Sequence, residues 1–257
     1  MTYGLYTVVT GSLAQERRLE ALTHNLANMA TPGFKADVPI FEVIPGPLPM
    51  GMPAVFPTQS HTLSSPLSLV QDAYSVFTSV KADLSAGELR RTGNSLDVAI
   101  HGQGWFSVET PNGVRYTRNG SFTLNPQGQL VTHEGWPVLG NGGPITIQGT
   151  NVIINPQGTI IVDGQEIDRL KVVDAQDNDA FQKAEHALFA LRSGASVEGT
   201  ETAADIKQGF LEQSNVNSIK GMTALIDAMR AYESYQKVLQ TWHETTGRAV
   251  NDVGRLR

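Results

Sequence analysis

The sequence has 257 residues, of which 40% are hydrophobic and 17% are charged. A chain of this length and composition can form one large core or two smaller ones, and it is not disordered as a whole. The net charge of −6 argues against a partner made of nucleic acid, because nucleic-acid binders usually present basic surfaces to the phosphates. The absence of cysteine excludes disulfides and thiolate metal sites.

The first residues do not resemble a cleaved secretion signal. The chain starts Met1-Thr2-Tyr3-Gly4-Leu5 and continues directly into an amphipathic pattern, without a basic region, an apolar run and a small-residue cleavage site. No apolar run approaches the roughly 20 residues of a membrane span. We therefore expect no direct membrane insertion and no cleaved signal peptide.

A helix is predicted from about residue 5 to residue 29. Its apolar residues recur at alternating steps of three and four, which is the spacing of a seam in a coiled coil or helical bundle. Ser12 and Gln15 are two polar interruptions of this seam. The sequence Thr31-Pro32-Gly33 ends the helix, because proline disfavours helical angles at the preceding residue and glycine allows a sharp turn.

The middle of the chain changes character twice. Residues 44–66 are rich in Pro, Gly, Met and Ser, which predicts an extended connector. From about Leu96, short alternating runs are separated by Asn-Gly, Asp-Gly and related turn sequences, which favour tight hairpins. Residues 124–131 and 154–161 resemble each other, either as an internal repeat or as two hairpins with similar turn chemistry. We predict a compact antiparallel β domain.

A second long helix is predicted after Asn217, whose side chain suits an N-cap. One apolar stripe on this helix contains Met222, Leu225, Met229, Tyr232 and Leu239. Further apolar residues widen the stripe, namely Ile219, Ile226, Tyr235, Val238 and Trp242. Because the stripe is wider than one partner helix needs, we expect this helix to contact more than one neighbour.

The predicted fold class is α+β, with a discontinuous α-helical coiled-coil domain from both termini and a central, mostly antiparallel β domain. The terminal helices occupy residues 1–35 and 208–257, the extended connector residues 36–87, and the β domain residues 88–207. Little lies between the two ends to bury their apolar stripes except each other. Apolar surface left exposed in this way usually marks an interface, so the sequence predicts assembly.

Patterns typical of catalysis, cofactor binding or metal binding are missing from the sequence. The six histidines form no pair at metal-ligand spacing, and the zinc-protease-like start at His243-Glu244 fails because position 247 is glycine. Asp97 and Glu109 are expected on alternating strands, with their carboxylates facing water. We predict no catalytic, cofactor-binding or metal-binding residue, no cofactor and no enzymatic activity.

Two asparagines near the end of the first helix have two interpretations. Asn25 and Asn28 lie beside the apolar seam, where their amides would cap free helix carbonyls. Alternatively, they form hydrogen bonds between subunits and fix the register of the helices, as polar residues at a seam do. Both interpretations are compatible with the sequence.

Four segments resemble the flagellar basal-body rod and hook proteins. The first contains Asn25-Leu26-Ala27-Asn28 and Gly33-Phe34-Lys35, which is very specific to these axial proteins. The others are residues 92–106, 116–124 and 211–217. Matches extend from residue 5 to about residue 242, and the connector alone has no matching motif.

The resemblance implies a structural subunit of the flagellar rod that assembles into the helical drive shaft for motility. Length and the two chain ends favour the proximal rod, and the alternative is the distal rod protein or another hook-like axial subunit. The implied partners are copies of the chain, other proximal and distal rod proteins, and the flagellar type III export apparatus. The implied location is the basal-body rod in the periplasmic space, reached without a cleaved signal peptide.

The seam positions and the family motif together give a set of candidate subunit-interface residues. These are Leu19, Leu22, Asn25, Leu26, Asn28, Phe34, Met222, Leu225, Met229, Tyr232 and Leu239.

Overall fold

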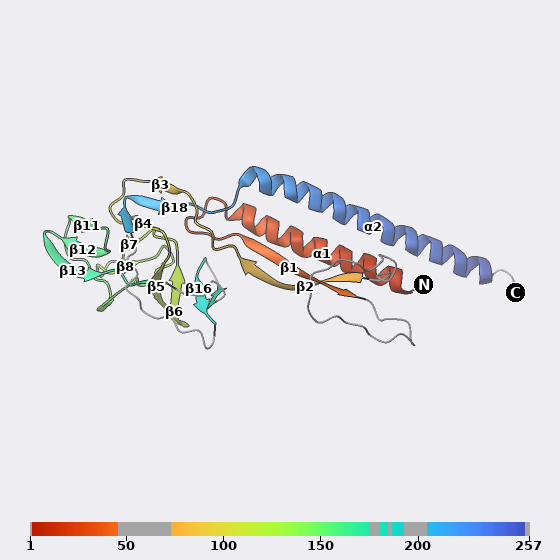
Figure 1. The fold of residues 1–257 in the computed structure, drawn as a ribbon, viewed down its shortest axis with the longest axis horizontal. Helices are drawn as coiled ribbons and strands as arrows, with labels where there is room; N and C mark the ends of the chain where they lie inside the picture. Colours follow the sequence, from red (N-terminus) through yellow and green to blue (C-terminus); the bar gives the residue numbers. More distant parts are fainter. Residues whose placement is uncertain (1, 46–72, 175–179, 185–186, 193–204, 255–257) are drawn as a thin grey trace, which may run out of the picture. The chain divides into compact units, whose positions relative to one another are not determined.

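The computed structural model describes residues 2–45, 73–174, 180–184, 187–192 and 205–254. Among these residues there are two long α-helices, one near each end of the chain, and many short strands between them in sequence (Figure 1). The predicted α+β class and the mostly antiparallel β domain are confirmed.

The chain forms two compact units. The helical unit contains Met1–Thr23, Pro39–Val80 and Lys220–Arg257. The β unit contains His24–Val38 and Lys81–Ile219. The last turn of the first helix and the segment that follows it therefore belong to the β unit.

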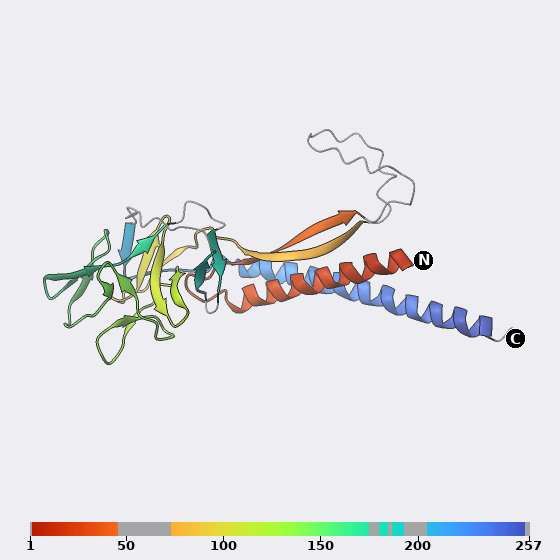
Figure 2. The same ribbon diagram turned by 90° about the horizontal axis from the view of Figure 1, so that it is seen from below.

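In the helical unit, α1 (Thr2–Ala27) and α2 (Ser218–Gly254) lie side by side and run in opposite directions (Figures 1 and 2). The helices approach closely at Gly11, where an added Cβ would lie 2.7 Å from the ring of Tyr235. Beside this contact, the Ser12 hydroxyl accepts a hydrogen bond of 3.4 Å from the Gln236 amide. Small side chains are also buried along the pair, namely Ala14, Ala21 and Ala228.

A two-stranded ribbon occupies both ends of the segment that was expected to be an extended connector. β1 (Asp37–Pro45) pairs with β2 (Ala73–Ala82), and the two strands run in opposite directions (Figure 1). The ring centroids of Phe41 and Phe77 are 6.1 Å apart, and the Arg17 guanidinium of α1 lies 5.7 Å from the Phe77 centroid. Most of the Pro- and Gly-rich stretch lies outside the described residues.

The strands of the β unit are short. They are β3 (Leu89–Arg91), β4 (Val98–His101), β5 (Trp105–Thr110), β6 (Gly113–Thr117), β7 (Thr123–Leu124), β8 (Leu130–Val131), β9 (Leu139–Gly140), β10 (Gly143–Pro144), β11 (Val152–Ile154), β12 (Thr159–Val162), β13 (Gln165–Arg169), β14 (Val172–Val173), β15 (Phe181–Lys183), β16 (Phe189–Leu191), β17 (Asp205–Gln208) and β18 (Phe210–Glu212). A five-stranded sheet has the order β14-β5-β6-β16-β15, and a three-stranded sheet has the order β11-β12-β13. The remaining pairs are β17-β4, β18-β3, β7-β8 and β10-β9.

Turns predicted from the sequence join several of these strands. Asn112 lies in the two-residue loop between β5 and β6 and is followed by Gly113, the first residue of β6, and Asp163-Gly164 joins β12 to β13. Asp163 has a φ of 52° and Gly164 a φ of 86°, a combination that suits a tight hairpin. The Asp163 carboxylate also accepts a hydrogen bond of 3.1 Å from the Asn151 backbone, which helps to hold this strained residue.

The two similar segments form the same turn. The side-chain oxygen of Asn125 accepts hydrogen bonds from the backbone of Gln127 and Gln129. In the second copy, Asn155 accepts the same two bonds from residues 157 and 159. The glycine at the fourth position of each turn, Gly128 or Gly158, has a positive φ. Shared turn chemistry therefore accounts for the similarity of the two segments.

The core of the β unit covers both faces of β4. Val98, Ala99 and Ile100 are all buried, although the alternating pattern predicted one apolar and one polar face. The expectation that Asp97 faces water is wrong, because Asp97 is buried and its carboxylate accepts a hydrogen bond of 3.1 Å from the Asn94 amide. Glu109 is exposed, as expected.

Candidate assembly interface and the junction network

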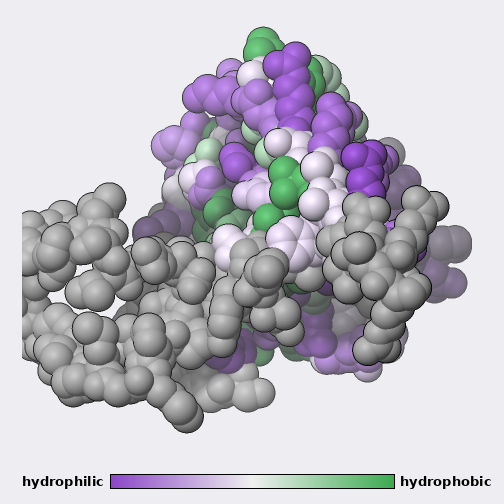
Figure 3. Space-filling view, turned by 90° about the vertical axis from the view of Figure 1, so that its right-hand side faces the viewer, coloured by the Kyte–Doolittle hydropathy of each residue, from purple (hydrophilic) through white to green (hydrophobic). Residues whose placement is uncertain are grey.

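The apolar residues of α2 divide into two stripes. The inner stripe, at steps of three and four, is buried or partly buried and contains Leu225, Ala228, Tyr232, Tyr235 and Leu239. The outer stripe has the same spacing and is 48% to 77% exposed; it contains Ile219, Met222, Ile226 and Met229. Figure 3 shows hydrophobic residues at the molecular surface between hydrophilic ones. A row of large exposed apolar side chains typically marks an interaction surface.

The predicted interface residues of α2 fall on both stripes. Met222 and Met229 belong to the outer stripe, whereas Leu225, Tyr232 and Leu239 belong to the inner stripe, on which Tyr235 packs against Gly11. On α1, Leu19, Leu22 and Leu26 are partly buried. Their contacts with other subunits stay a prediction.

Asn25 and Asn28 both make hydrogen bonds inside the chain. Asn28 donates from its amide to the His24 carbonyl at 2.9 Å, in the last turn of α1, where the Asn28 backbone donates to the same carbonyl at 3.2 Å. Asn25 is buried, and its amide pairs with the backbone of Asp37, accepting at 2.7 Å and donating at 2.8 Å. The capping interpretation therefore describes Asn28, and Asn25 fastens the last turn of α1 to the start of β1.

Asp37 connects this turn to β15. One carboxylate oxygen lies 2.6 Å from His24 Nδ1, and the other accepts a hydrogen bond of 2.7 Å from Lys183. The Lys183 ammonium lies 4.0 Å from the ring centroid of Phe34, a cation–π contact. Phe34, a predicted interface residue, is 2% exposed in the chain. A depression of about 390 Å³ beside this cluster is lined in part by His24, Phe34 and Lys183.

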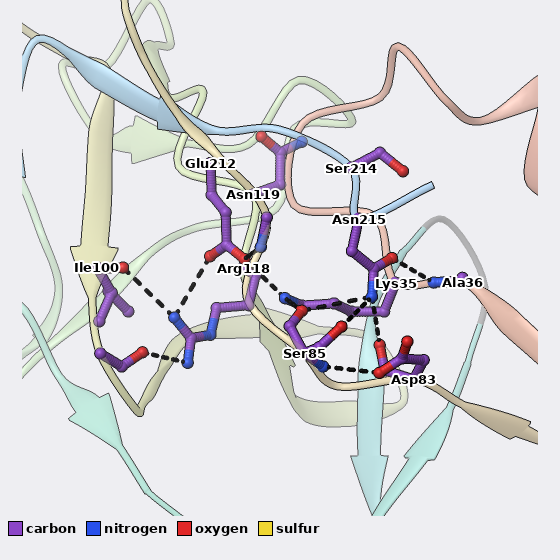
Figure 4. A network of polar contacts seen from close by, with 12 residues as sticks. Lys35, Ala36, Asp83, Ser85, Ile100, Arg118, Asn119, Glu212, Ser214 and Asn215 are labelled. Atoms are coloured by element: carbon purple, nitrogen blue, oxygen red, sulfur yellow. Dashed lines mark hydrogen bonds and ion pairs between the residues drawn. The ribbon is translucent and has the colours of Figure 1, made fainter. Parts of the chain in front are cut away.

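A buried ionic network lies where the segments after α1, after β2 and before α2 meet. We name Lys35, Ser85, Arg118, Glu212 and Asn215 the junction network (Figure 4). One Glu212 carboxylate oxygen accepts a hydrogen bond of 2.6 Å from Lys35, and the other lies 3.3 Å from the Arg118 guanidinium. Lys35 and Glu212 are each 1% exposed, and Arg118 is 7% exposed.

Backbone groups supply further hydrogen bonds to these charges. Lys35 also donates to the Ser85 carbonyl at 2.6 Å, and Glu212 also accepts a bond of 2.9 Å from the Gly87 backbone. Arg118 donates to the Gly102 carbonyl at 2.8 Å. A buried ion pair needs such additional bonds, because each ion loses its water on burial.

Burial dominates the titration of the two cations. Burial lowers the pKa of Lys35, because desolvation disfavours the charged ammonium, and the pairing with Glu212 opposes this shift. Burial likewise lowers the pKa of Arg118, and Glu212 again opposes the shift. Glu212 therefore offsets part of the desolvation of both cations.

Asn215 joins the same segments through neutral hydrogen bonds. Its side-chain oxygen accepts from the Ala36 backbone at 2.8 Å, and its amide donates to the Asp83 carbonyl at 2.8 Å and to the Ser85 hydroxyl at 3.0 Å (Figure 4). Sequence reasoning did not single out any member of the junction network as a site. The available signal was that Lys35, Arg118, Glu212 and Asn215 all lie in the family motifs.

No cluster of three or more His, Cys, Asp or Glu side chains suited to a metal ion occurs in the described part of the chain. Neither described helix is long and apolar enough to cross a membrane. The features that remain are two long terminal helices, one with a solvent-exposed apolar stripe, and an antiparallel β unit closed by buried charges. They define an α+β protein whose candidate site is a surface for association.

Comparisons with known proteins agree with this class. A model described as "Flagella basal body rod protein" matches residues 5–35. The "Flagellar hook protein FlgE/F/G D1 domain" model matches residues 99–162, and the "Flagellar basal body rod FlgEFG protein C-terminal" model matches residues 207–252.

Whole proteins of the same kind match over all or nearly all of their length. The flagellar basal-body rod protein FlgF of Rhizobium meliloti (strain 1021) is 33% identical over 262 residues, covering 100% of both chains. FlgF of Salmonella typhimurium (strain LT2) is 35% identical, covering 97% of both. The basal-body rod protein FlgG of Bacillus subtilis (strain 168) is 31% identical, covering 98% of this chain and 99% of the relative. The chain belongs to the flagellar basal-body rod protein family.

Proposed function

We propose that the chain is a structural, non-enzymatic subunit of the proximal flagellar rod. The observation that carries this proposal is the outer stripe of α2, which leaves a row of large apolar side chains in solvent on a family member matched along its whole length. A second copy or a related rod protein would bury this stripe. The gain in free energy is about 25 cal/mol for each Å² of apolar surface removed from water.

In the proposed assembly, the helices and the β domain take different positions. In this proposal the helices within residues 1–35 and 208–257 form an inner, coiled-coil-like tube, residues 36–87 connect, and residues 88–207 form the outer β domain. Residues 24–35 and 208–217, which lie within the two terminal segments, pack in the β unit. Contacts between copies are head-to-tail, because such contacts generate an open helical assembly rather than a closed ring. The eleven predicted interface residues belong to this proposal, together with Ile219 and Ile226 of the outer stripe.

The proposed route and neighbours follow from family membership. The chain leaves the cytoplasm through the flagellar type III export apparatus without cleavage, and it assembles in the periplasmic space with copies of itself and with other rod proteins. Similarity to proteins named FlgF, at 33% and 35% identity, supports the proximal position. The alternative is the distal rod protein or another hook-like subunit, and relatives named FlgG reach 31% and 32% identity.

Deletion of the gene tests the role in the bacterium that carries it. We expect non-motile cells whose basal bodies, imaged by electron microscopy, end within the periplasm, and we expect the gene supplied in trans to restore motility. The height of the remaining stump separates a proximal from a distal position. Motile cells with complete rods would contradict the proposal.

Complementation with variants then tests the outer stripe. Met222→Asp combined with Met229→Asp places two charges on the stripe, and we expect failure to restore motility although the exported protein keeps its β unit. Ser234→Asp combined with Thr241→Asp is the matched control, because it also adds two charges seven residues apart, at exposed positions of α2 away from both stripes. Full motility with the double variant would remove the outer stripe from the interface.

A further inference from the structure

The last two strands of the β unit pair with its first two. β17 pairs with β4, which places Ile206 opposite Ile100, and β18 pairs with β3, which places Leu211 opposite Arg90. Ile206 belongs to the main core cluster, and Leu211 is also buried. The unit is therefore closed by strands that come from opposite ends of its sequence.

Backbone groups of early segments also depend on the late segment. The Glu212 carbonyl accepts a hydrogen bond of 2.8 Å from the Gly33 backbone, and the Gln213 backbone donates one of 2.8 Å to the Glu88 carbonyl. The Asn215 side chain adds its bonds to the segments after α1 and after β2. Burying a backbone group without a hydrogen-bond partner costs free energy. A chain that lacks the late segment would bury several such groups, so its folded form is less stable.

The two buried cations strengthen this dependence. Lys35 and Arg118 are almost fully buried, and the carboxylate in direct contact with both is that of Glu212. Before residue 212 is available, folding would bury two positive charges close together without this carboxylate. Burying an unpaired charge is strongly unfavourable. Folding of the incomplete unit therefore lacks the contacts of the last strands and also carries the cost of two buried cations without their carboxylate.

We propose that residues 205–215 are the closing segment of the β unit, and that Lys35 and Arg118 make folding wait for Glu212. When the chain leaves a ribosome or an export channel with its N-terminus first, the part outside then stays unfolded until nearly the whole β unit is outside. Resting on the proposed function, this delay has a use: the part of the chain that has left the export channel does not fold into an incomplete β unit before residue 215 follows it.

The order of folding can be measured during synthesis on the ribosome. Nascent chains of increasing length, ending with the complete chain, are joined to a translation arrest peptide, and release of the arrest reports the force of folding near the tunnel exit. We expect no release at lengths that expose residues 24–200, and release once residue 215 is outside. Release at the shorter lengths would overturn the proposal.

The same series of nascent chains with Glu212→Gln tests the role of Lys35 and Arg118. It keeps the size of the side chain and removes the charge, so we expect a several-fold weaker release at the same length. The matched control is Glu109→Gln, which makes the same change at an exposed position of β5 and should leave the release unchanged. Equal release from both variants would overturn the part assigned to Lys35 and Arg118.

The assay needs no flagellar component, so it is independent of the proposed function. Release at short lengths, together with a non-motile deletion strain, would overturn the folding role of the closing segment and leave the proposed rod function in place. Release only at long lengths, together with a motile deletion strain, would support the folding role and overturn the proposed rod function.

Discussion

At the scale of single residues, the junction network shows how a few charges hold distant segments together. Glu212 sits between Lys35 and Arg118, and its backbone carbonyl binds Gly33 as well. These groups have all of their hydrogen-bond and ion-pair partners only when three separate segments are in place. A substitution in one member of the junction network is therefore expected to affect the whole β unit.

Glu212→Gln is expected to lower the free energy of unfolding by about 3–5 kcal/mol, because breaking a buried ion pair leaves the partner charges uncompensated. Chemical denaturation followed by the fluorescence of the buried Trp105 measures this change. The exposed control Glu109→Gln should stay within about 0.5 kcal/mol of the parent. Similar stability of both variants would show that Glu212 contributes little.

Asn25→Ala is expected to cost about 1–3 kcal/mol in the free energy of unfolding, because it leaves the partly buried backbone of Asp37 without its two hydrogen bonds to Asn25. Hydrogen exchange of the Asp37 amide gives the local readout and should become faster. Asn28→Ala, which removes a cap at a more exposed position, is expected to cost less. A larger loss for Asn28→Ala would reverse the roles assigned to the two amides.

Residue-level sequence reasoning found the motif residues but not their partners. Asn25 and Asn28 attracted attention because amides beside an apolar seam are unusual. Lys35 and Glu212 did not, because an isolated lysine or glutamate normally lies on the surface. The hydrogen bond between them joins residues 177 apart in sequence, and no local pattern records such a pairing.

At the scale of elements, the helices were the most predictable part. A 3.6-residue period identifies an amphipathic helix wherever the chain lies, and α1 and α2 end within a few residues of their expected limits. The division of α2 into an inner and an outer stripe was not predictable. It depends on where Gly11 lets the two helices approach, which is a property of the pair.

The ribbon of β1 and β2 was not predicted for a related reason. Its strands belong to one sheet only because they pair with each other, and many residues separate them in the sequence. The tight hairpins of the β unit were easier to predict, since an Asn-Gly or Asp-Gly pair sets the turn locally.

Gly11→Leu is expected to push the Tyr235 ring away from α1, because even a Cβ would lie 2.7 Å from it. The chain has no natural cysteine, so Ser12→Cys and Gln236→Cys can be linked by a short thiol reagent as a readout of helix contact. We expect a several-fold lower yield of the link with Gly11→Leu. Gly247→Ala, where nothing lies within 4 Å, should leave the yield unchanged.

At the scale of the whole molecule, the boundary of the β unit lies within α1. Residues 24–38 belong to this unit and contribute Phe34 and Lys35 to its interior. The motif that is most specific to the family therefore has a structural task in the β unit, beside any task it has between subunits.

A chain of residues 24–219 is expected to fold cooperatively, whereas a chain of residues 36–219 is not. The shorter chain lacks Phe34 and Lys35, which are nearly fully buried, and it lacks Asn25, which binds the start of β1. Thermal unfolding followed by circular dichroism compares the two. Equal melting temperatures would show that residues 24–35 do not belong to the folding unit.

The separation of Lys35 and Glu212 has a consequence for chain length. The free energy of closing a loop grows only with the logarithm of its length, so doubling the loop costs about 0.6 kcal/mol. The junction network therefore sets almost no limit on how much polypeptide lies between its two ends. An inserted domain at the exposed hairpin tip of Pro111-Asn112 should leave the pairing of these ends intact, and the same closure suits a much longer protein.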